Sequence, residues 1–264
     1  METTIEPIAR LTKDIREAAK NLTDDEARFL VDLYYQIQDF RIGAASQVRS
    51  MEKTQEPVFV LTWSRDTMET IEKEIRFWLK KYAERKPLGE WAMGICGIGP
   101  VLAAGLMAHI DITKAPTVGH IWRFAGLDPT SKWEKKTKRP YNAALKVLCW
   151  KIGESFVKVS GNDADIYGKI YLQRKALEIQ KNDAGEYAAQ AATALQTKNY
   201  GKTTEAYKHY ITGKLPPGHI HARAKRYAVK LFLSHYHAEA YRQHFGKEPP
   251  LPYPIAHLGH VHQI

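Results

Sequence analysis

The sequence predicts an all-α fold, and three observations lead to that prediction. Apolar residues recur at three- and four-residue steps over two long stretches near the start, which is the period of an amphipathic helix. Segments that alternate apolar and polar residues, as strands do, are not found at useful length. A long helical pattern follows a Pro-Pro-Gly break near the end. We expect a helical hairpin or coiled coil at residues 1–87, a compact domain at 88–160 and a helical extension at 161–264.

The front region is expected to hold two helices. Thr23 and Glu26 form the pattern of a capping box, which opens the first of them. Its apolar positions are Leu30, Leu33, Ile37, Phe40, Ala44 and Val48, and those of the second are Met68, Ile71, Ile75, Trp78 and Tyr82. Val58–Leu61 is read as the packed start of the second helix rather than a strand. The two helices form either an antiparallel hairpin, which could pair subunits, or two amphipathic helices packed on the core.

The charge of the chain favours a polyanionic partner. Its 264 residues carry a net charge of +10, with 44% hydrophobic residues to form a core. DNA, RNA and an anionic membrane surface all remain possible on this ground. Two cysteines without CxxC spacing, Cys96 and Cys149, indicate buried thiols in a reducing compartment, and the polar N-terminus shows no signal-peptide core. A cytoplasmic protein is expected.

Residues 91–110 contain no Asp, Glu, Lys or Arg and are long enough to cross a bilayer. They also contain Gly94, Gly97, Gly99, Pro100 and Gly105, so the stretch is weakly hydrophobic and interrupted in its middle. We therefore expect no membrane span.

The same stretch carries the motif on which the functional prediction depends. Residues 95–106 follow the pattern of a helix-hairpin-helix, in which Gly97 and Gly99 permit unusual backbone angles and Ile98 plugs into the core. Pro100 suits the first turn of the next helix. Such a turn presents the amides of the helix start, around Gly99 and Val101, to a phosphate. The alternative is a tight helix-helix turn that only packs.

A basic loop with aromatic neighbours follows in the same domain. Its aromatic residues are Trp122, Trp133 and Tyr141, and its cations are Lys132, Lys135, Lys136, Lys138 and Arg139. Lys and Arg mixed with aromatic rings can neutralise phosphates and stack on bases. The alternative is a solvated loop whose aromatic residues belong to the core.

These residues resemble a known family. The segment GIGPVLAAGLMAHI, the run Phe124-Ala125-Gly126-Leu127-Asp128-Pro129 and the following helix YNAALKVLCWKIGESF are similar to the C-terminal domain of the insertion-sequence 110/116/902 transposases. The resemblance covers about residues 88–160. It implies a DNA partner, assembly into oligomers and a structured RNA guide.

The resemblance also implies a RuvC-like front domain with four metal-binding acidic residues, and a serine nucleophile in the C-terminal domain. Residues 1–87 are instead predicted to be helical, without an acidic tetrad. The place of the family's serine reads Trp133-Glu134-Lys135, and Ser131 is the nearest serine, a weak catalytic candidate with no evident activating neighbour. No cofactor is predicted, and magnesium would be needed only for catalysis.

Nine of the 11 histidines follow residue 208. The pairs His219/His221 and His235/His237 are spaced so that the two rings point to different sides of a helix, which argues against a shared metal. A tail of three histidines at 257, 260 and 262 could chelate a metal but lacks evident carboxylates, so no metal site is predicted. On the last helix, expected over about 219–244, a basic face is predicted from His221, Arg223, Lys225, Arg226 and Lys230, with Arg226 and Lys230 on one side and Arg223 beside them.

The leading hypothesis is a DNA-binding protein of transposase descent that holds the phosphate backbone. The alternatives are an active transposase or recombinase that uses Ser131 or an unrecognised carboxylate set, and an RNA-binding partner of a mobile element. A fourth possibility is a scaffold without nucleic-acid affinity.

Overall fold

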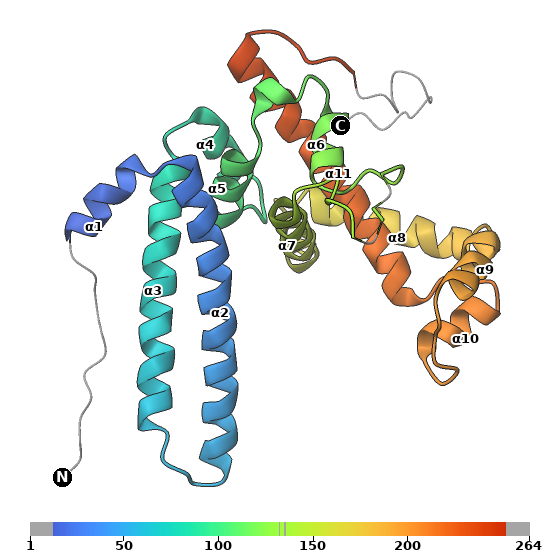
Figure 1. The fold of residues 1–264 in the computed structure, drawn as a ribbon, viewed down its shortest axis with the longest axis horizontal. Helices are drawn as coiled ribbons and strands as arrows, with labels where there is room; N and C mark the ends of the chain where they lie inside the picture. Colours follow the sequence, from blue (N-terminus) through green and yellow to red (C-terminus); the bar gives the residue numbers. More distant parts are fainter. Residues whose placement is uncertain (1–12, 132, 135, 252–264) are drawn as a thin grey trace. The chain divides into compact units, whose positions relative to one another are not determined.

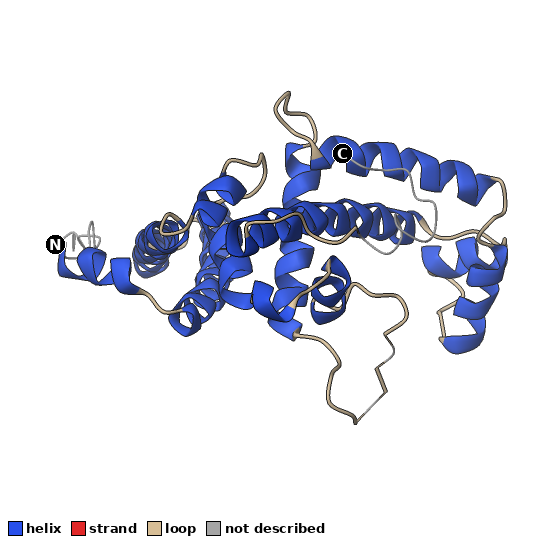
Figure 2. Cartoon of the chain, turned by 90° about the horizontal axis from the view of Figure 1, so that it is seen from above, coloured by secondary structure: helices blue, strands red, loops and turns tan. Residues whose placement is uncertain are grey.

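The computed structural model describes residues 13–131, 133–134 and 136–251, and these contain helices and loops but no strand. Figure 1 shows the helices in chain order, and Figure 2 shows that loops make up the remainder. The all-α class is therefore confirmed. The chain divides into two compact units, which are described separately. The first contains α1 to α5, and the second contains residues 95–97 with α6 to α11.

The first unit is built on a long antiparallel pair, α2 (Asp24–Lys53) and α3 (Phe59–Ala83) (Figure 1). The predicted capping box opens α2, because the Thr23 side chain accepts from the Glu26 amide and the Glu26 carboxylate accepts from the Thr23 amide. The two helices thus form a hairpin, and both also pack against α5, so the structure combines the two predicted alternatives. Phe59 and Val60 do start α3, but they are 68% and 71% exposed, so the prediction that this start is packed was wrong.

Short elements complete this unit. α1 (Lys13–Ala18) and a 3-10 turn (Ala19–Asn21) precede α2, and α4 (Pro87–Met93), α5 (Pro100–His109) and a second 3-10 turn (Ile112–Lys114) follow α3. α5 packs against α2, α3 and α4, and every residue from Val101 to Ala108 is buried. The apolar stretch at residues 91–110, considered above as a membrane span, is thus divided among the end of α4, a turn and the core helix α5. Within the described residues, no helix is long and apolar enough to cross a bilayer.

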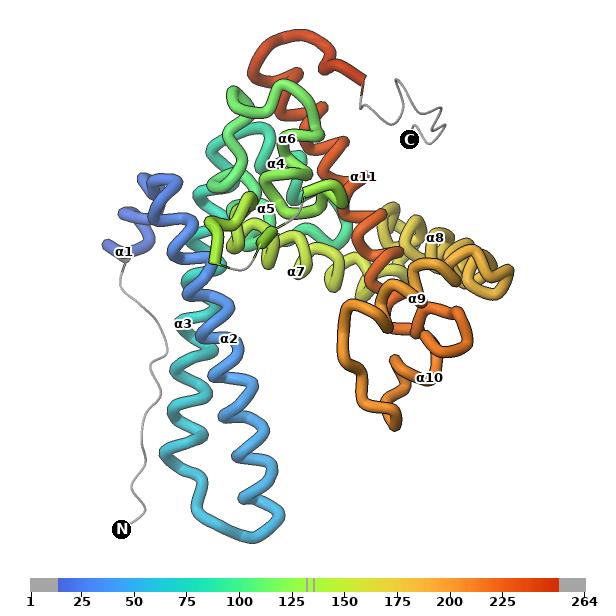
Figure 3. Tube along the Cα trace, turned by 45° about the vertical axis from the view of Figure 1, so that its right-hand side comes forward, coloured from blue at the N-terminus to red at the C-terminus, as the bar shows by residue number. Residues whose placement is uncertain are grey.

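The second unit is organised around α11 (Pro217–Phe245), which runs beside α6 (Val118–Phe124), α7 (Ala143–Val159) and α8 (Tyr167–Asp183) (Figure 3). The rings of Phe156, Tyr167 and Phe232 join α7, α8 and α11, with centroids 4.9–5.5 Å apart. Aromatic contacts of this geometry add to the free energy gained by burial.

A smaller core holds α9 (Ala188–Thr197) and α10 (Glu205–Ile211) beside the start of α11. Ala191, Tyr210, Leu215 and Ile220 are its buried members. The Pro-Pro-Gly break forms the start of α11: Pro216 is its N-cap, and Pro217 is its first residue, where no amide partner is needed. The predicted long last helix is confirmed and ends one residue later than expected, at Phe245 before a left-handed Gly246.

The histidines of this unit have separate partners. Nδ1 of His221 lies 2.7 Å from the Tyr171 hydroxyl, and Nδ1 of His235 lies 2.7 Å from that of Tyr167. His237 is buried, and its Nε2 donates to the Ala115 carbonyl at 2.8 Å. In the part of the chain that is described, no group of three or more His, Cys, Asp or Glu residues could hold a metal. The tail histidines at 257, 260 and 262 lie outside it.

The buried His237 predicts a loss of stability in acid. Burial lowers its pKa below the usual 6.5, against the smaller raising effect of its hydrogen bond to Ala115. In acid, the unfolded chain therefore binds a proton at this histidine more readily than the folded chain does. The contribution of His237 to the free energy of unfolding is fully present above about pH 6.5 and is lost as the pH falls below that value. We expect this loss to lower the free energy of unfolding by up to about 1.4 kcal/mol at pH 5.5, relative to neutral pH.

Urea unfolding at pH 7.5 and 5.5 measures this loss. The variant His237→Gln, which cannot titrate, should lose less stability between the two pH values than the wild type. Equal losses in the two proteins would show that His237 does not contribute to the pH dependence.

Candidate nucleic-acid interface

The segment predicted to be a helix-hairpin-helix lies in α4, the turn Gly94–Gly99 and α5. Pro100 is the first residue of α5, as predicted, and Ile98 is buried. The boundary between the two compact units runs through this turn. Residues 95–97 belong to the second unit, whereas Ile98–Lys114 belong to the first. Whether the turn binds a phosphate in the manner of a helix-hairpin-helix stays a prediction.

The two glycines of the turn have different roles. Gly97 has φ +92°, and a Cβ there would lie 3.1 Å from Val159 and 3.2 Å from Phe156. Its carbonyl accepts from the Ser155 hydroxyl at 2.5 Å. Only glycine fits such a position without strain. Gly97 thus anchors the turn to α7 by packing.

Gly99 does not need the conformational freedom of glycine. It is the N-cap of α5 with φ −88° and ψ 176°, which is extended backbone open to any residue, so the prediction of an unusual backbone angle was wrong here. No described atom lies within 4 Å of the place where its Cβ would be. The space in front of the helix start is therefore open at this residue.

The first turn of α5 keeps the features of an anion site. No described side chain caps it, and the Gly99 carbonyl accepts only in the first helical bond, from the Ala103 amide. Pro100 has no amide, so Val101 and Leu102 carry the amides that a cap would normally take. These amides, together with the positive end of the helix dipole, could hold a phosphate oxygen.

α6 ends in a motif that explains the Gly126-Leu127 pair. Gly126 has φ +65°, its amide donates to the Arg123 carbonyl, and the Leu127 amide donates to the Trp122 carbonyl at 2.8 Å. These are the two bonds of a Schellman ending, which favours glycine at this position. The chain then enters the loop that leads to α7.

The described residues of the loop from Leu127 to Tyr141 form no helix (Figure 2). Asp128 accepts from the amide and hydroxyl of Thr130 at 2.9 and 2.7 Å, and these bonds lower the pKa of its carboxyl group. At the far end, the Asn142 amide donates to the Phe124 carbonyl and its side chain caps α7. Both ends of the loop are therefore held firmly to α6 and α7.

Five cations of the loop and of α7 form no ion pair with a described carboxylate. No described carboxylate lies within ion-pair distance of them; they are Lys136, Lys138 and Arg139 of the loop and Lys146 and Lys158 of α7. Many of the cations of α2, α3, α8 and α11, by contrast, form such pairs. Lys132 and Lys135, also predicted to bind DNA, lie outside the described residues.

All three of the predicted aromatic residues have a cation near the ring, and two of these pairs lie in or beside the loop. The Arg139 guanidinium lies 5.5 Å from the centre of the Trp133 ring, and Lys146 Nζ lies 4.1 Å from that of Tyr141. Trp133 is also tied to its own loop, because its Nε1 donates to the Thr137 carbonyl at 2.9 Å. Cations and rings are thus interleaved along this surface, as they are in many nucleic-acid sites.

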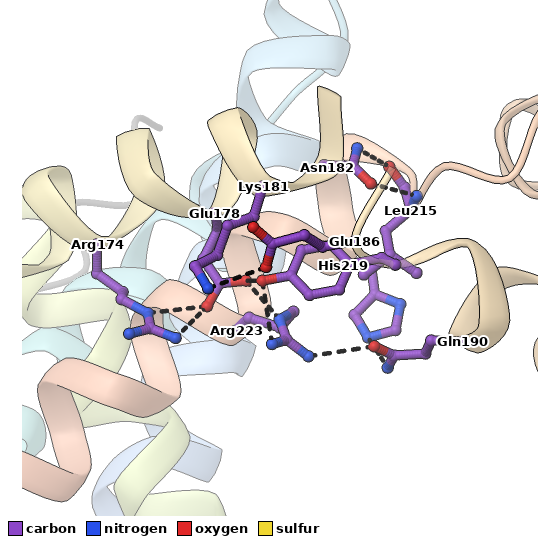
Figure 4. A network of polar contacts seen from close by, with 10 residues as sticks. Arg174, Glu178, Lys181, Asn182, Glu186, Gln190, Leu215, His219 and Arg223 are labelled. Carbon is purple, nitrogen blue, oxygen red and sulfur yellow. Dashed lines mark hydrogen bonds and ion pairs between the residues drawn. The ribbon is translucent and has the colours of Figure 1, made fainter. Parts of the chain in front are cut away.

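The predicted basic face of the last helix is divided by its contacts. Arg223 donates to the buried carboxylate of Glu178 at 2.6 Å (Figure 4). Lys230 lies over the Trp122 ring with Nζ 4.2 Å from its centre, and burial lowers its pKa. Arg226 remains exposed. Only Arg226 of this predicted set faces solvent without a described ion pair.

Ser131 shows no sign of activation. Its amide donates to the Asp128 carbonyl at 3.3 Å, while no described histidine, lysine or carboxylate hydrogen-bonds to its hydroxyl. A nucleophilic serine needs a base within hydrogen-bond reach. The described residues around Ser131 do not supply one.

The comparisons with known proteins concern this same part of the chain. Residues 90–152 match the model of the transposase IS116/IS110/IS902 family. The resemblance inferred from the residues is confirmed for that segment. No curated protein and no solved structure matches the chain. The transposase-matching segment contains α5, α6, the basic loop and most of α7.

The transposase-matching segment contains nine Lys and Arg residues and four Asp and Glu residues, so its net charge is +5. Half of the chain's net charge of +10 therefore lies in about a quarter of its length. The sequence prediction overlooked the cations of α7 and the ring of Trp150. Their signal was present, since Lys146 and Trp150 are one turn apart on the face opposite the buried Leu148 and Ile152.

Proposed function

We propose that this protein is a mobile-element protein related to transposases that binds DNA through its phosphate backbone. The observation that carries the proposal is the cluster of cations without described acidic partners in the loop before α7 and on α7, inside the segment that matches the transposase family. Such cations gain free energy by releasing counterions from DNA. Contacts of this kind do not read base sequence, so weak sequence preference is expected.

The start of α5, in the first unit, is a separate proposed contact to the phosphate backbone. The open space at Gly99 and the uncapped amides of Val101 and Leu102 support a phosphate position there. Catalysis is not part of the proposal, since the described residues around Ser131 offer no base. Structured RNA is the second candidate partner, because the aromatic rings near the loop could stack on unpaired bases.

A second copy of the chain is a further proposed partner, through the α2–α3 hairpin. Phe29 and Phe40 are each 68% exposed and lie three helical turns apart, on the same side of α2. Exposed aromatic residues on a two-helix hairpin are typical of a face that another hairpin covers. Sedimentation equilibrium measures this association, and a monomer at micromolar concentration would contradict it.

Three substitutions at Gly99 test the phosphate position. In Gly99→Asp, the side chain should cap α5, raising stability by a few tenths of a kcal/mol, and place a negative charge where the phosphate would bind. We expect its affinity for duplex DNA to fall about tenfold or more. Gly99→Asn should cap the helix without the charge and lose less affinity. Gly99→Ala, which adds only a methyl group in open space, should bind as the wild type does.

Fluorescence anisotropy with labelled duplex DNA and a structured RNA measures these affinities, and thermal unfolding monitors the fold. The proposed function fails if the wild type binds neither nucleic acid. The position at α5 fails if Gly99→Asp binds as tightly as Gly99→Ala.

A further inference from the structure

One tryptophan of the second unit lies on the outside of its helix. Trp150 of α7 is 55% exposed, and Val147, one turn before it, is exposed to the same extent. The opposite side of α7 carries the buried Leu145, Leu148 and Ile152. The helix therefore has its core face elsewhere, and the Trp150 ring is not needed to fill the core.

Cations surround this ring. Lys225 Nζ of α11 lies 5.6 Å from the ring centre, and Lys151 Nζ lies 5.7 Å from it. Lys146 precedes Trp150 by one helical turn. Glu154 is paired with Lys225 and so does not offer a free negative charge. An exposed ring among positive charges suits a partner that is both flat and anionic, and a nucleotide has both properties.

The exposed ring continues a surface already described. Lys146 joins it to Tyr141, whose ring centre lies 4.1 Å from Lys146 Nζ, and Arg139 and Trp133 form the next pair along the loop. Aromatic and cationic side chains thus alternate from the basic loop along α7. Proteins that bind single strands use this arrangement, in which rings stack on bases and cations follow the backbone. A duplex cannot use it in this way, because its base faces are already stacked on each other.

We infer that Trp150 is a stacking platform for an unpaired base of DNA or RNA, with Lys146 and Lys151 on the flanking phosphates. This inference rests on the proposed nucleic-acid binding and adds to it the structural state of the bound strand. The platform provides affinity for unpaired segments, whereas the start of α5 and the basic loop act on any backbone.

Anisotropy with three labelled oligonucleotides tests the inference in the full chain. These are a single-stranded DNA, a single-stranded RNA of the same sequence and a blunt duplex. Trp150→Ala should weaken binding to the single strands about tenfold or more and change duplex binding less than about threefold. Trp150→Phe, which keeps a ring, should stay within about threefold of the wild type on all three. The tighter of the two single strands identifies the source of the base.

A matched control removes an equally exposed apolar side chain elsewhere in the same unit. Ile211 of α10 is 59% exposed, and Ile211→Ala should leave all three affinities unchanged. A direct readout is 2-aminopurine within the single strand, whose emission should fall on binding to the wild type and not on binding to Trp150→Ala.

The outcomes separate the two proposals. If the wild type binds no nucleic acid, the proposed function fails and the platform with it. If the wild type binds the duplex while Trp150→Ala binds single strands as the wild type does, only the platform is wrong. A Trp150→Ala variant that changes the sedimentation of the free protein and not its single-strand affinity would assign this surface to contacts between copies and overturn the inference.

Discussion

Replacing Lys136, Lys138 and Arg139 together by alanine should make nucleic-acid binding much less sensitive to salt. Each phosphate that a cation neutralises on duplex DNA contributes about −0.9 to the slope of log K against log salt. If the five cations without a described ion pair (Lys136, Lys138, Arg139, Lys146 and Lys158) all contact phosphates, the wild-type slope is about −4.5, and affinity falls by roughly 500-fold between 50 and 200 mM salt. The triple variant should keep a slope of only about −2.

The reason is that Lys136, Lys138 and Arg139 form no ion pair with a described carboxylate of their own protein. Their charge is therefore free to replace the counterions of DNA. A matched control is the triple variant Lys20→Ala, Lys73→Ala and Lys208→Ala, in which each exposed lysine pairs with a carboxylate three or four residues away. The control lowers the net charge of the chain by the same amount, and its slope should change by less than about 0.5.

Anisotropy across a salt series measures both slopes. A flat affinity in the wild type would rule out the electrostatic mechanism. Equal reductions in the two triple variants would mean that only the overall charge matters and that the loop is not a contact surface.

Glu178→Ala should be strongly destabilising, by about 2–4 kcal/mol. Glu178 is 1% exposed, and its carboxylate accepts from Arg174, Arg223 and the Tyr187 hydroxyl at 2.5–2.8 Å (Figure 4). Burial opposes ionisation of this group, but the hydrogen bonds from Arg223, Tyr187 and Arg174 outweigh it and leave its pKa below the usual value. Without the carboxylate, two mostly buried guanidinium groups lose their shared partner, which costs more than the loss of one exposed pair.

This expected loss of stability is smaller than that for breaking a fully buried ion pair, because both arginine side chains are about a quarter exposed to water. Glu178→Gln, which keeps one acceptor oxygen, should lose about half as much stability. Glu186→Ala removes an exposed carboxylate that pairs with Lys181 and should change stability by less than about 0.5 kcal/mol. Urea unfolding followed by circular dichroism compares the three. Unfolding of Glu178→Ala at the same midpoint as Glu186→Ala would show that the network in Figure 4 adds no stability.

The same network decided what the last helix can do. Charge and spacing alone placed Arg223 and Lys230 beside Arg226 on a basic face. In the structure, Arg223 pairs with Glu178 of α8, which lies 45 residues earlier in the chain. Lys230 packs over the Trp122 ring. Partners so distant in sequence leave no trace in local spacing, so this part of the candidate surface could not be predicted.

What the sequence determined by itself is local. The helices, the capping box at Thr23, the break before α11 and the turn at Gly97 follow from apolar periodicity and from residues whose backbone preferences act within a few positions. The transposase resemblance of residues 90–152 also belongs here, since it is a pattern of successive residues.

Tertiary structure alone decided which side chains remain available to a ligand. It anchored Gly97 to α7, left Gly99 open, and buried one face of α7 so that Trp150 faces outward among lysines. The physical reason is that burial and ion pairing are properties of elements brought together from distant parts of the chain. A charged or aromatic side chain can bind a partner only where it is neither buried in the core nor paired with another residue of its own chain.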